Sequence, residues 1–163
     1  MSEVYLGNPN LKKANTPIEF TEEQIREFLK CKENPVYFAQ NYVKIVSLDE
    51  GLVPFKPYDF QEKLINNFHE NRFNICKMPR QTGKSTTVVS YLLHYAVFND
   101  SVNIGILANK AATARELLGR LQTAYENLPK WMQQGVLVWN RGSLELENGS
   151  KILAASTSAS AVR

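Results

Sequence analysis

Residues 73–85 read FNICKMPRQTGKS. Apolar and polar residues alternate from Phe73 to Met78, which predicts a β-strand ending at Pro79. The apolar residues that follow Gly83 predict a helix from Lys84 to about Phe98. A strand, a short loop and a helix in this order are typical of phosphate-binding folds, in which the loop holds the anion at the helix N-terminus.

The loop fits the second half of a phosphate-binding consensus. That consensus is G-x-x-x-x-G-K-[ST], and residues 78–85 read MPRQTGKS, without the first glycine. Gly83 permits close approach of the backbone, Lys84 supplies a positive charge for the β- and γ-phosphates, and Ser85 supplies a hydroxyl for Mg²⁺. The alternative is a chance turn, but the flanking strand and helix patterns favour ATP binding.

Two further side chains extend this predicted site. Arg80 lies close enough in sequence to reach a γ-phosphate, as an arginine finger supplied in cis, although it could instead pair with a surface carboxylate. Gln61 begins a helical pattern upstream, and its amide could read the edge of an adenine as donor and acceptor. An exposed helical glutamine is the alternative for Gln61.

The rest of the chain predicts an α/β fold. A second, apolar strand is predicted over residues 102–108, and with the strand at 73–78 and the helix from Lys84 it would complete a right-handed βαβ unit with a parallel sheet. A helix over 110–127, which Asn109 could cap, is predicted to follow. Short strands are predicted at 136–139, 143–146 and 151–155, the last two joined by an Asn148-Gly149 hairpin turn.

The first 70 residues carry no strand pattern. Residues 1–20 predict an arm, and helices are expected over 22–31, after Pro35, and over 58–70, with a loop over 47–57. The Thr21 and Gln24 side chains predict a capping box for the first helix.

Composition adds little about function. The chain has 163 residues and a net charge of +3, a small excess that favours a nucleic-acid partner only slightly. Cys31 and Cys76 have no metal-ligand spacing, so both are expected to be buried, reduced thiols. No signal peptide or membrane-spanning run is present, which indicates a cytosolic protein.

Several stretches resemble the large terminase subunit of tailed phages, most closely the T-even type. They are RQTGKST (80–86), YDFQ (58–61), YLGNPNLK (5–12), VYFA (36–39), GILANK (105–110), WNRGS (139–143) and AVR (161–163). The resemblance implies a RecA- or helicase-like P-loop NTPase that uses ATP and Mg²⁺ to move double-stranded DNA into a capsid. It also implies a homo-oligomeric ring, a portal protein and a small terminase subunit as partners, and a location in the host cytoplasm.

The same resemblance assigns roles to individual residues. Lys84 would contact the β- and γ-phosphates, Ser85 the magnesium, Arg80 the γ-phosphate and Gln61 the adenine, with Phe60 stacking near the base. Gln81, Thr82, Gly83 and Thr86 complete the predicted nucleotide-binding set.

One part of the family pattern is absent from the sequence. The apolar strand ending in Asp-Glu, which positions magnesium and activates water, would be expected after Arg163. IVSLDE (45–50) is no substitute, because it precedes the phosphate-binding loop. We therefore expect an N-terminal part at 1–57, a partial ATPase core at 58–163, and weak ATP binding with little hydrolysis.

Two other functions are compatible with parts of the pattern. A helicase-like, nucleic-acid-dependent ATPase would share the upstream glutamine, but the missing first glycine and Arg80 favour a terminase. A small-molecule kinase or non-hydrolysing nucleotide-binding module would need neither the arm nor Gln61.

Overall fold

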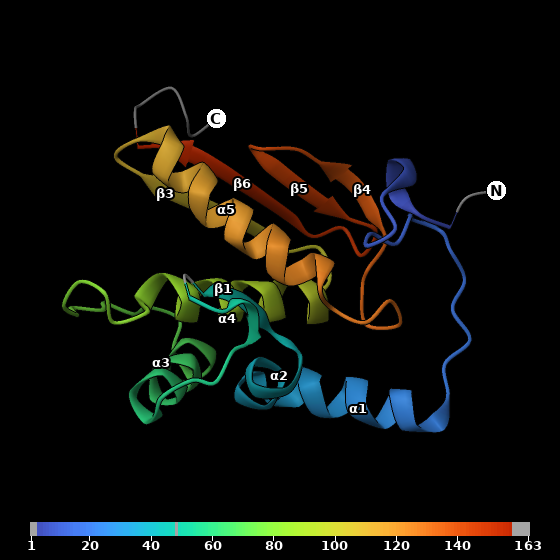
Figure 1. Ribbon diagram of the computed structural model, residues 1–163, viewed down its shortest axis with the longest axis horizontal. Helices are drawn as coiled ribbons and strands as arrows, with labels where there is room; N and C mark the ends of the chain where they lie inside the picture. Colours follow the sequence, from blue (N-terminus) through green and yellow to red (C-terminus); the bar gives the residue numbers. More distant parts are fainter. Residues whose placement is uncertain (1–2, 48, 158–163) are drawn as a thin grey trace.

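The computed structural model describes residues 3–47 and 49–157 and shows helices combined with a large and a small β-sheet. The AVR stretch at 161–163 lies outside the described residues. In Figure 1, helix α4 runs through the middle, with α5 and the larger sheet on one side and α1 to α3 on the other. The helices are α1 (Glu22–Glu33), α2 (Pro35–Tyr42), α3 (Asp59–Glu70), α4 (Lys84–Phe98) and α5 (Ala111–Glu126), with a 3-10 turn at Tyr5–Gly7.

The larger sheet has four strands in the order β3-β6-β5-β4. Strands β3 and β6 are parallel and in register from Asn103 opposite Lys151 to Ala108 opposite Ser156, whereas β5 pairs antiparallel with both β6 and β4. The sheet is therefore mixed, with one parallel pair among the described strands. Its strands are β3 (Asn103–Ala108), β4 (Val136–Trp139), β5 (Ser143–Leu146) and β6 (Lys151–Ser156).

The core lies between this sheet, α5 and α4. Leu118 and Leu121 of α5 are fully buried, as are Leu93 and Ala96 of α4. Helix α4 is apolar on most sides because it packs against α5 and also against α2 and α3. The helix that begins at the phosphate-binding loop is thus the central element of the fold.

Local signals placed the first two helices correctly. The Thr21 hydroxyl accepts from the Gln24 backbone N–H at 3.2 Å, and the Gln24 side chain accepts from the Thr21 N–H at 3.1 Å, which confirms the capping box. Pro35 occupies the first turn of α2, and the side chain of Asn34 caps that helix.

The predicted strand at residues 73–78 is wrong. This segment pairs with none of the described strands and forms no regular secondary structure, with Phe73 82% and Ile75 101% exposed. A strand is defined by hydrogen bonds to a neighbour, and the alternating pattern cannot supply that neighbour. Cys76 is consequently exposed, contrary to prediction, whereas Cys31 is buried as expected.

Two smaller predictions also fail. The predicted loop at 47–57 contains a hairpin, because β1 (Lys44–Ser47) pairs antiparallel with β2 (Gly51–Pro54), and Asp49 and Glu50 lie at its tip. Gly51 has a positive φ of 73°, which the tight turn requires. Helix α5 is preceded by Lys110 at its N-cap position, and not by Asn109.

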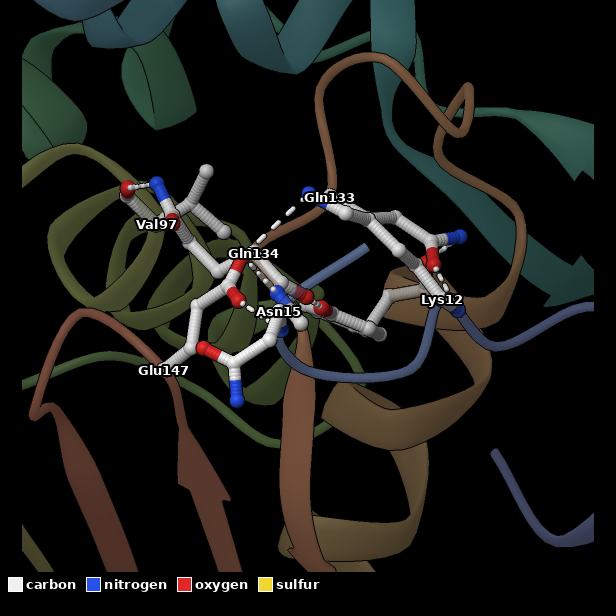
Figure 2. Close-up of polar contacts among 8 residues, drawn as sticks. Lys12, Asn15, Val97, Gln133, Gln134 and Glu147 are labelled. Carbon is white, nitrogen blue, oxygen red and sulfur yellow. Dashed lines mark hydrogen bonds and ion pairs between the residues drawn. The ribbon is translucent and has the colours of Figure 1, made fainter. Parts of the chain in front are cut away.

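The N-terminal arm lies on the β4 edge of the sheet (Figure 1). The side chain of Leu11 is 1% exposed, and the Val136 N–H donates to the Lys12 carbonyl at 2.9 Å. Figure 2 shows Lys12, Asn15, Gln133 and Glu147 converging at this edge. Glu147 accepts from Lys12 Nζ at 3.2 Å and from the Asn15 N–H at 2.8 Å, so the arm is held by specific contacts.

Candidate nucleotide site

The phosphate loop, residues 78–83, lies between the irregular segment 72–77 and the first turn of α4. Lys84 and Ser85 line a cavity of about 150 Å³ together with Ile106 of β3 and Leu117 of α5. One wall of this cavity is therefore formed by β3, while the rest comes from α4 and α5.

The backbone of the loop is folded tightly. Gln81 and Gly83 have positive φ angles of 61° and 72°, and the Thr82 hydroxyl donates to the Pro79 carbonyl at 3.0 Å. Residues in left-handed conformation turn successive N–H groups toward one side of the chain and form an anion-binding concavity. The chain reaches this conformation without the first glycine of the consensus.

The N-terminus of α4 is suited to an anion. Gly83 is its N-cap residue and provides no side-chain cap, and the first turn contains no acidic residue. Helix N-terminal N–H groups carry partial positive charge and have no partner within the helix. The Thr87 hydroxyl donates to the Gly83 carbonyl at 3.0 Å and holds the loop to the helix.

Lys84 points its ammonium group into the loop. Its Nζ donates to the Met78 carbonyl at 2.7 Å, across the whole length of the phosphate loop. The positive charge is therefore turned back over the loop, where a phosphate oxygen could replace the carbonyl as acceptor.

Gln61 is not the exposed glutamine that was the alternative prediction. Its side chain is only 3% exposed, its Oε1 accepts from the Tyr58 N–H at 2.9 Å, and its Nε2 lies 3.4 Å from the Thr82 carbonyl. The structure thus brings Gln61 to the phosphate loop from α3. Its adenine-reading role stays a prediction.

The other predicted residues lie around this centre. Arg80 and Gln81 are exposed on the loop, whereas Ser85 and Thr86 are half-buried in the first turn of α4. Thr86 also lines a larger cavity, of about 730 Å³, between α4, α5 and β1. The Ser85 hydroxyl is a suitable oxygen ligand for magnesium, and no group of three or more metal-ligating His, Cys, Asp or Glu residues occurs among residues 3–47 and 49–157.

Phe60 lies at the start of α3 with 44% of its surface exposed. Its ring stacks on that of Tyr58, with centroids 5.8 Å apart and planes 12° apart. Tyr58, which is 70% exposed, and Thr87 were not among the predicted site residues. The signal that could have identified Tyr58 is the pair of aromatic residues flanking the predicted helix start, directly before Gln61.

Comparison with known proteins identifies the family. The sequence model described as "Terminase large subunit, T4likevirus-type, N-terminal" matches residues 75–163, which is more than half of the chain. The chain belongs to this terminase family. The matched region includes the phosphate loop, α4 and the whole four-stranded sheet.

The fold of the terminase chain also resembles a solved structure. The crystal structure of the HK97 bacteriophage large terminase is similar with a TM-score of 0.64 and 18% sequence identity. The match covers 81% of this chain but 28% of the HK97 chain. Within the described part of the terminase chain, no helix is both long and apolar enough to cross a membrane.

Proposed function

We propose that this chain is the ATP-binding part of a viral DNA-packaging motor that couples ATP hydrolysis to translocation of double-stranded DNA into a capsid. The observation that carries the proposal is the Lys84 ammonium group, held inside the phosphate loop at the uncapped N-terminus of α4. Membership of the large terminase family supports the link to genome packaging.

The residues of the loop have complementary roles in this proposal. Lys84 binds the β- and γ-phosphates, Ser85 holds Mg²⁺ through its hydroxyl, and Arg80 approaches the γ-phosphate. The backbone N–H groups of residues 81–86 surround the phosphates. Bound Mg²⁺ would neutralise charge on the phosphates, while the loop fixes their position.

The core of the motor is proposed to be a RecA- or helicase-like P-loop fold. The parallel pair β3 and β6, covered by α5, supports this assignment. The family also suggests double-stranded DNA, a portal protein and a small terminase subunit as partners, a homo-oligomeric ring, and action in the host cytoplasm. For residues 1–163 we propose ATP binding at the phosphate loop.

The test is Mg²⁺-dependent binding of a fluorescent ATP analogue. Lys84→Ala should weaken binding by roughly 10- to 100-fold, because it removes a charged hydrogen bond to phosphate. Lys77→Ala is the matched control, since Lys77 is exposed on the segment before the loop. Equal binding by wild type and Lys84→Ala would refute the proposed site.

A further inference from the structure

The cavity of about 730 Å³ that Thr86 lines lies between β1, α4 and α5, near the centre of Figure 1. Thr86 is the one lining residue that also belongs to the predicted nucleotide-binding set. The volume falls within the range of about 300–1,000 Å³ that is usual for small-molecule sites. The cavity therefore has the size of a binding site separate from the phosphate loop.

The inner wall of this cavity is apolar. Val43, Val89 and Ala124 contribute to it from the start of β1, from α4 and from α5, and each is at most 5% exposed. The Thr123 hydroxyl does not add a free hydrogen-bonding group, because it donates to the Gly119 carbonyl of its own helix at 3.1 Å. The wall thus offers mainly hydrocarbon surface to a ligand.

Gly119 leaves space on the α5 side of the cavity. Lining residues Glu116, Gly119, Arg120 and Thr123 follow the spacing of one helix face. A glycine inside a helix is less favourable than an alanine. A Cβ at Gly119 would nevertheless have no heavy atom within 4 Å, so no close approach of another segment requires the glycine. Its effect in this structure is a wider cavity.

The exposed rim of the cavity carries one net positive charge. Its charged lining residues are Lys44, Glu116 and Arg120. Arg120 Nη2 lies 2.7 Å from Glu116 Oε1, so these two charges are paired. Lys44 is exposed and belongs to none of the ion pairs found among residues 3–47 and 49–157. An uncompensated ammonium group therefore stands beside an apolar wall.

We propose that this cavity binds a small amphiphile with one negative charge, of the class of free medium-chain carboxylates. The hydrocarbon chain packs against Val43, Val89 and Ala124, and the carboxylate pairs with Lys44. An apolar pocket with a few polar groups that fix the orientation of the ligand is the usual form of a small-molecule site. The inference goes beyond the proposed function, because it requires no nucleotide.

The experiment is an amide chemical-shift titration of the ¹⁵N-labelled protein with decanoate, decanol or acetate. Decanoate should shift residues 43–46 and 116–124. Decanol lacks the charge and should bind about two- to fivefold more weakly. Acetate lacks the chain and should bind at least about tenfold more weakly. No saturable binding of decanoate below its micelle concentration, or shifts outside those residues, would overturn the proposal.

Gly119→Leu tests the place of binding, because the new side chain occupies the open space beside α5. It should weaken decanoate binding by at least about tenfold. Thr113→Leu is the matched control, since Thr113 is exposed on the same helix outside the cavity, and its affinity should equal that of wild type. Unchanged decanoate affinity in Gly119→Leu would contradict the proposed site.

Lys44→Gln keeps the test decisive if Gly119→Leu does not fold, because Lys44 is exposed. It should weaken decanoate by about two- to fivefold and leave decanol unchanged. Lys56→Gln, at an exposed lysine between β2 and α3, is the control and should bind both ligands as wild type does. Equal decanoate affinity in wild type and Lys44→Gln would overturn the pairing of the carboxylate with Lys44.

Analytical ultracentrifugation tests whether the cavity is filled by protein instead. Wild type and Gly119→Leu should both sediment as the same species. A wild-type dimer that Gly119→Leu converts to a monomer would show that a second copy of the chain occupies the cavity, and the proposed ligand would be wrong.

Discussion

The two ends of α4 are built in opposite ways. At its C-terminus, Asn148 Nδ2 donates to the carbonyls of Ala96 and Asn99 at 2.9 and 3.1 Å, and Gln134 Nε2 donates to the Val97 carbonyl at 3.1 Å. At its N-terminus, Gly83 provides no side-chain cap. One end is closed by side chains from the β4–β6 region, and the other remains open to the phosphate loop.

We expect the closed C-terminal end of α4 to contribute mainly to stability and the open N-terminal end mainly to nucleotide binding. Unpaired groups at a helix end cost free energy, and a glycine N-cap such as Gly83 costs roughly a few tenths of a kcal/mol relative to a capping side chain. The closed end avoids that cost through contacts with distant parts of the chain. The open end retains it, and a bound phosphate could recover it by accepting from the free N–H groups.

The largest effect is expected from Gly83→Val at the open end. A valine would be strained at a φ of 72°, and its Cβ would clash with Gln61 Nε2. The two penalties together predict a loss of nucleotide affinity of about a hundredfold or more. Titration of the variant with Mg²⁺ and ATP measures this loss.

Gly105→Ala is the control for that experiment. A Cβ at Gly105 would have no heavy atom within 4 Å, and its affinity for ATP should match that of wild type. A Gly83→Val protein that binds ATP normally would show that the loop conformation does not matter for binding.

Acidification should lower the free energy of unfolding, because His94 is buried in the C-terminal half of α4. Burial lowers the pKa of His94 from 6.5 to about 4, although its Nε2 lies 2.8 Å from the Cys31 carbonyl. Between these values the unfolded chain takes up a proton that the folded chain does not, so the free energy of unfolding falls as the pH falls. The full difference is about 3 kcal/mol, at 1.36 kcal/mol per pKa unit.

Urea unfolding at pH values from 7 to 4 measures this dependence. His94→Gln should remove most of the slope, whereas His69→Gln, which changes the neighbouring ring 6.0 Å away, should keep it. The same slope in wild type and His94→Gln would contradict the assignment to His94.

Asn148→Ala should reduce stability at the closed C-terminal end of α4 and leave nucleotide binding at the open N-terminal end unchanged. The change leaves the Ala96 and Asn99 carbonyls without this donor and also removes the acceptor of the Ser150 N–H. We expect a loss of about 2 kcal/mol in unfolding free energy, which lowers Tm by roughly 4–8 °C. Calorimetry gives the Tm, and the ATP affinity of the folded variant should be unchanged.

The smallest effect is expected from Lys12→Ala, which loosens the arm at the β4 edge. Burial would raise the pKa of Glu147, but hydrogen bonds from the Asn15 and Gly135 backbone and from Lys12 lower it overall. Lys12 is one of these partners, so its loss should cost about 1 kcal/mol and raise the pKa of Glu147. Arg26→Ala, at an exposed ion pair within α1, is the control and should change stability less.

Sequence patterns predicted the local elements well and the long-range contacts poorly. The capping box at Thr21 and the apolar face of α4 depend on residues a few positions apart, and both are confirmed. The alternation at 73–78 gave a wrong strand, because strand formation depends on a neighbour that no local pattern reports.

The site shows the same limit. The motif located Gly83, Lys84 and Ser85 at the start of a helix because their spacing is local. The buried contact of Gln61 with Thr82 spans 21 positions and the Lys12–Glu147 ion pair spans 135, and neither leaves a signal in the nearby sequence. Such contacts follow from the tertiary fold.

The most direct test of the open and closed ends of α4 is an amide chemical-shift titration of the ¹⁵N-labelled protein with ATP and Mg²⁺. We predict the largest shifts at the N–H groups of residues 81–86 and little change at 96–99. Saturable binding that shifts residues 96–99, or any other region, and leaves 81–86 unchanged would contradict the placement of the nucleotide at the N-terminus of α4.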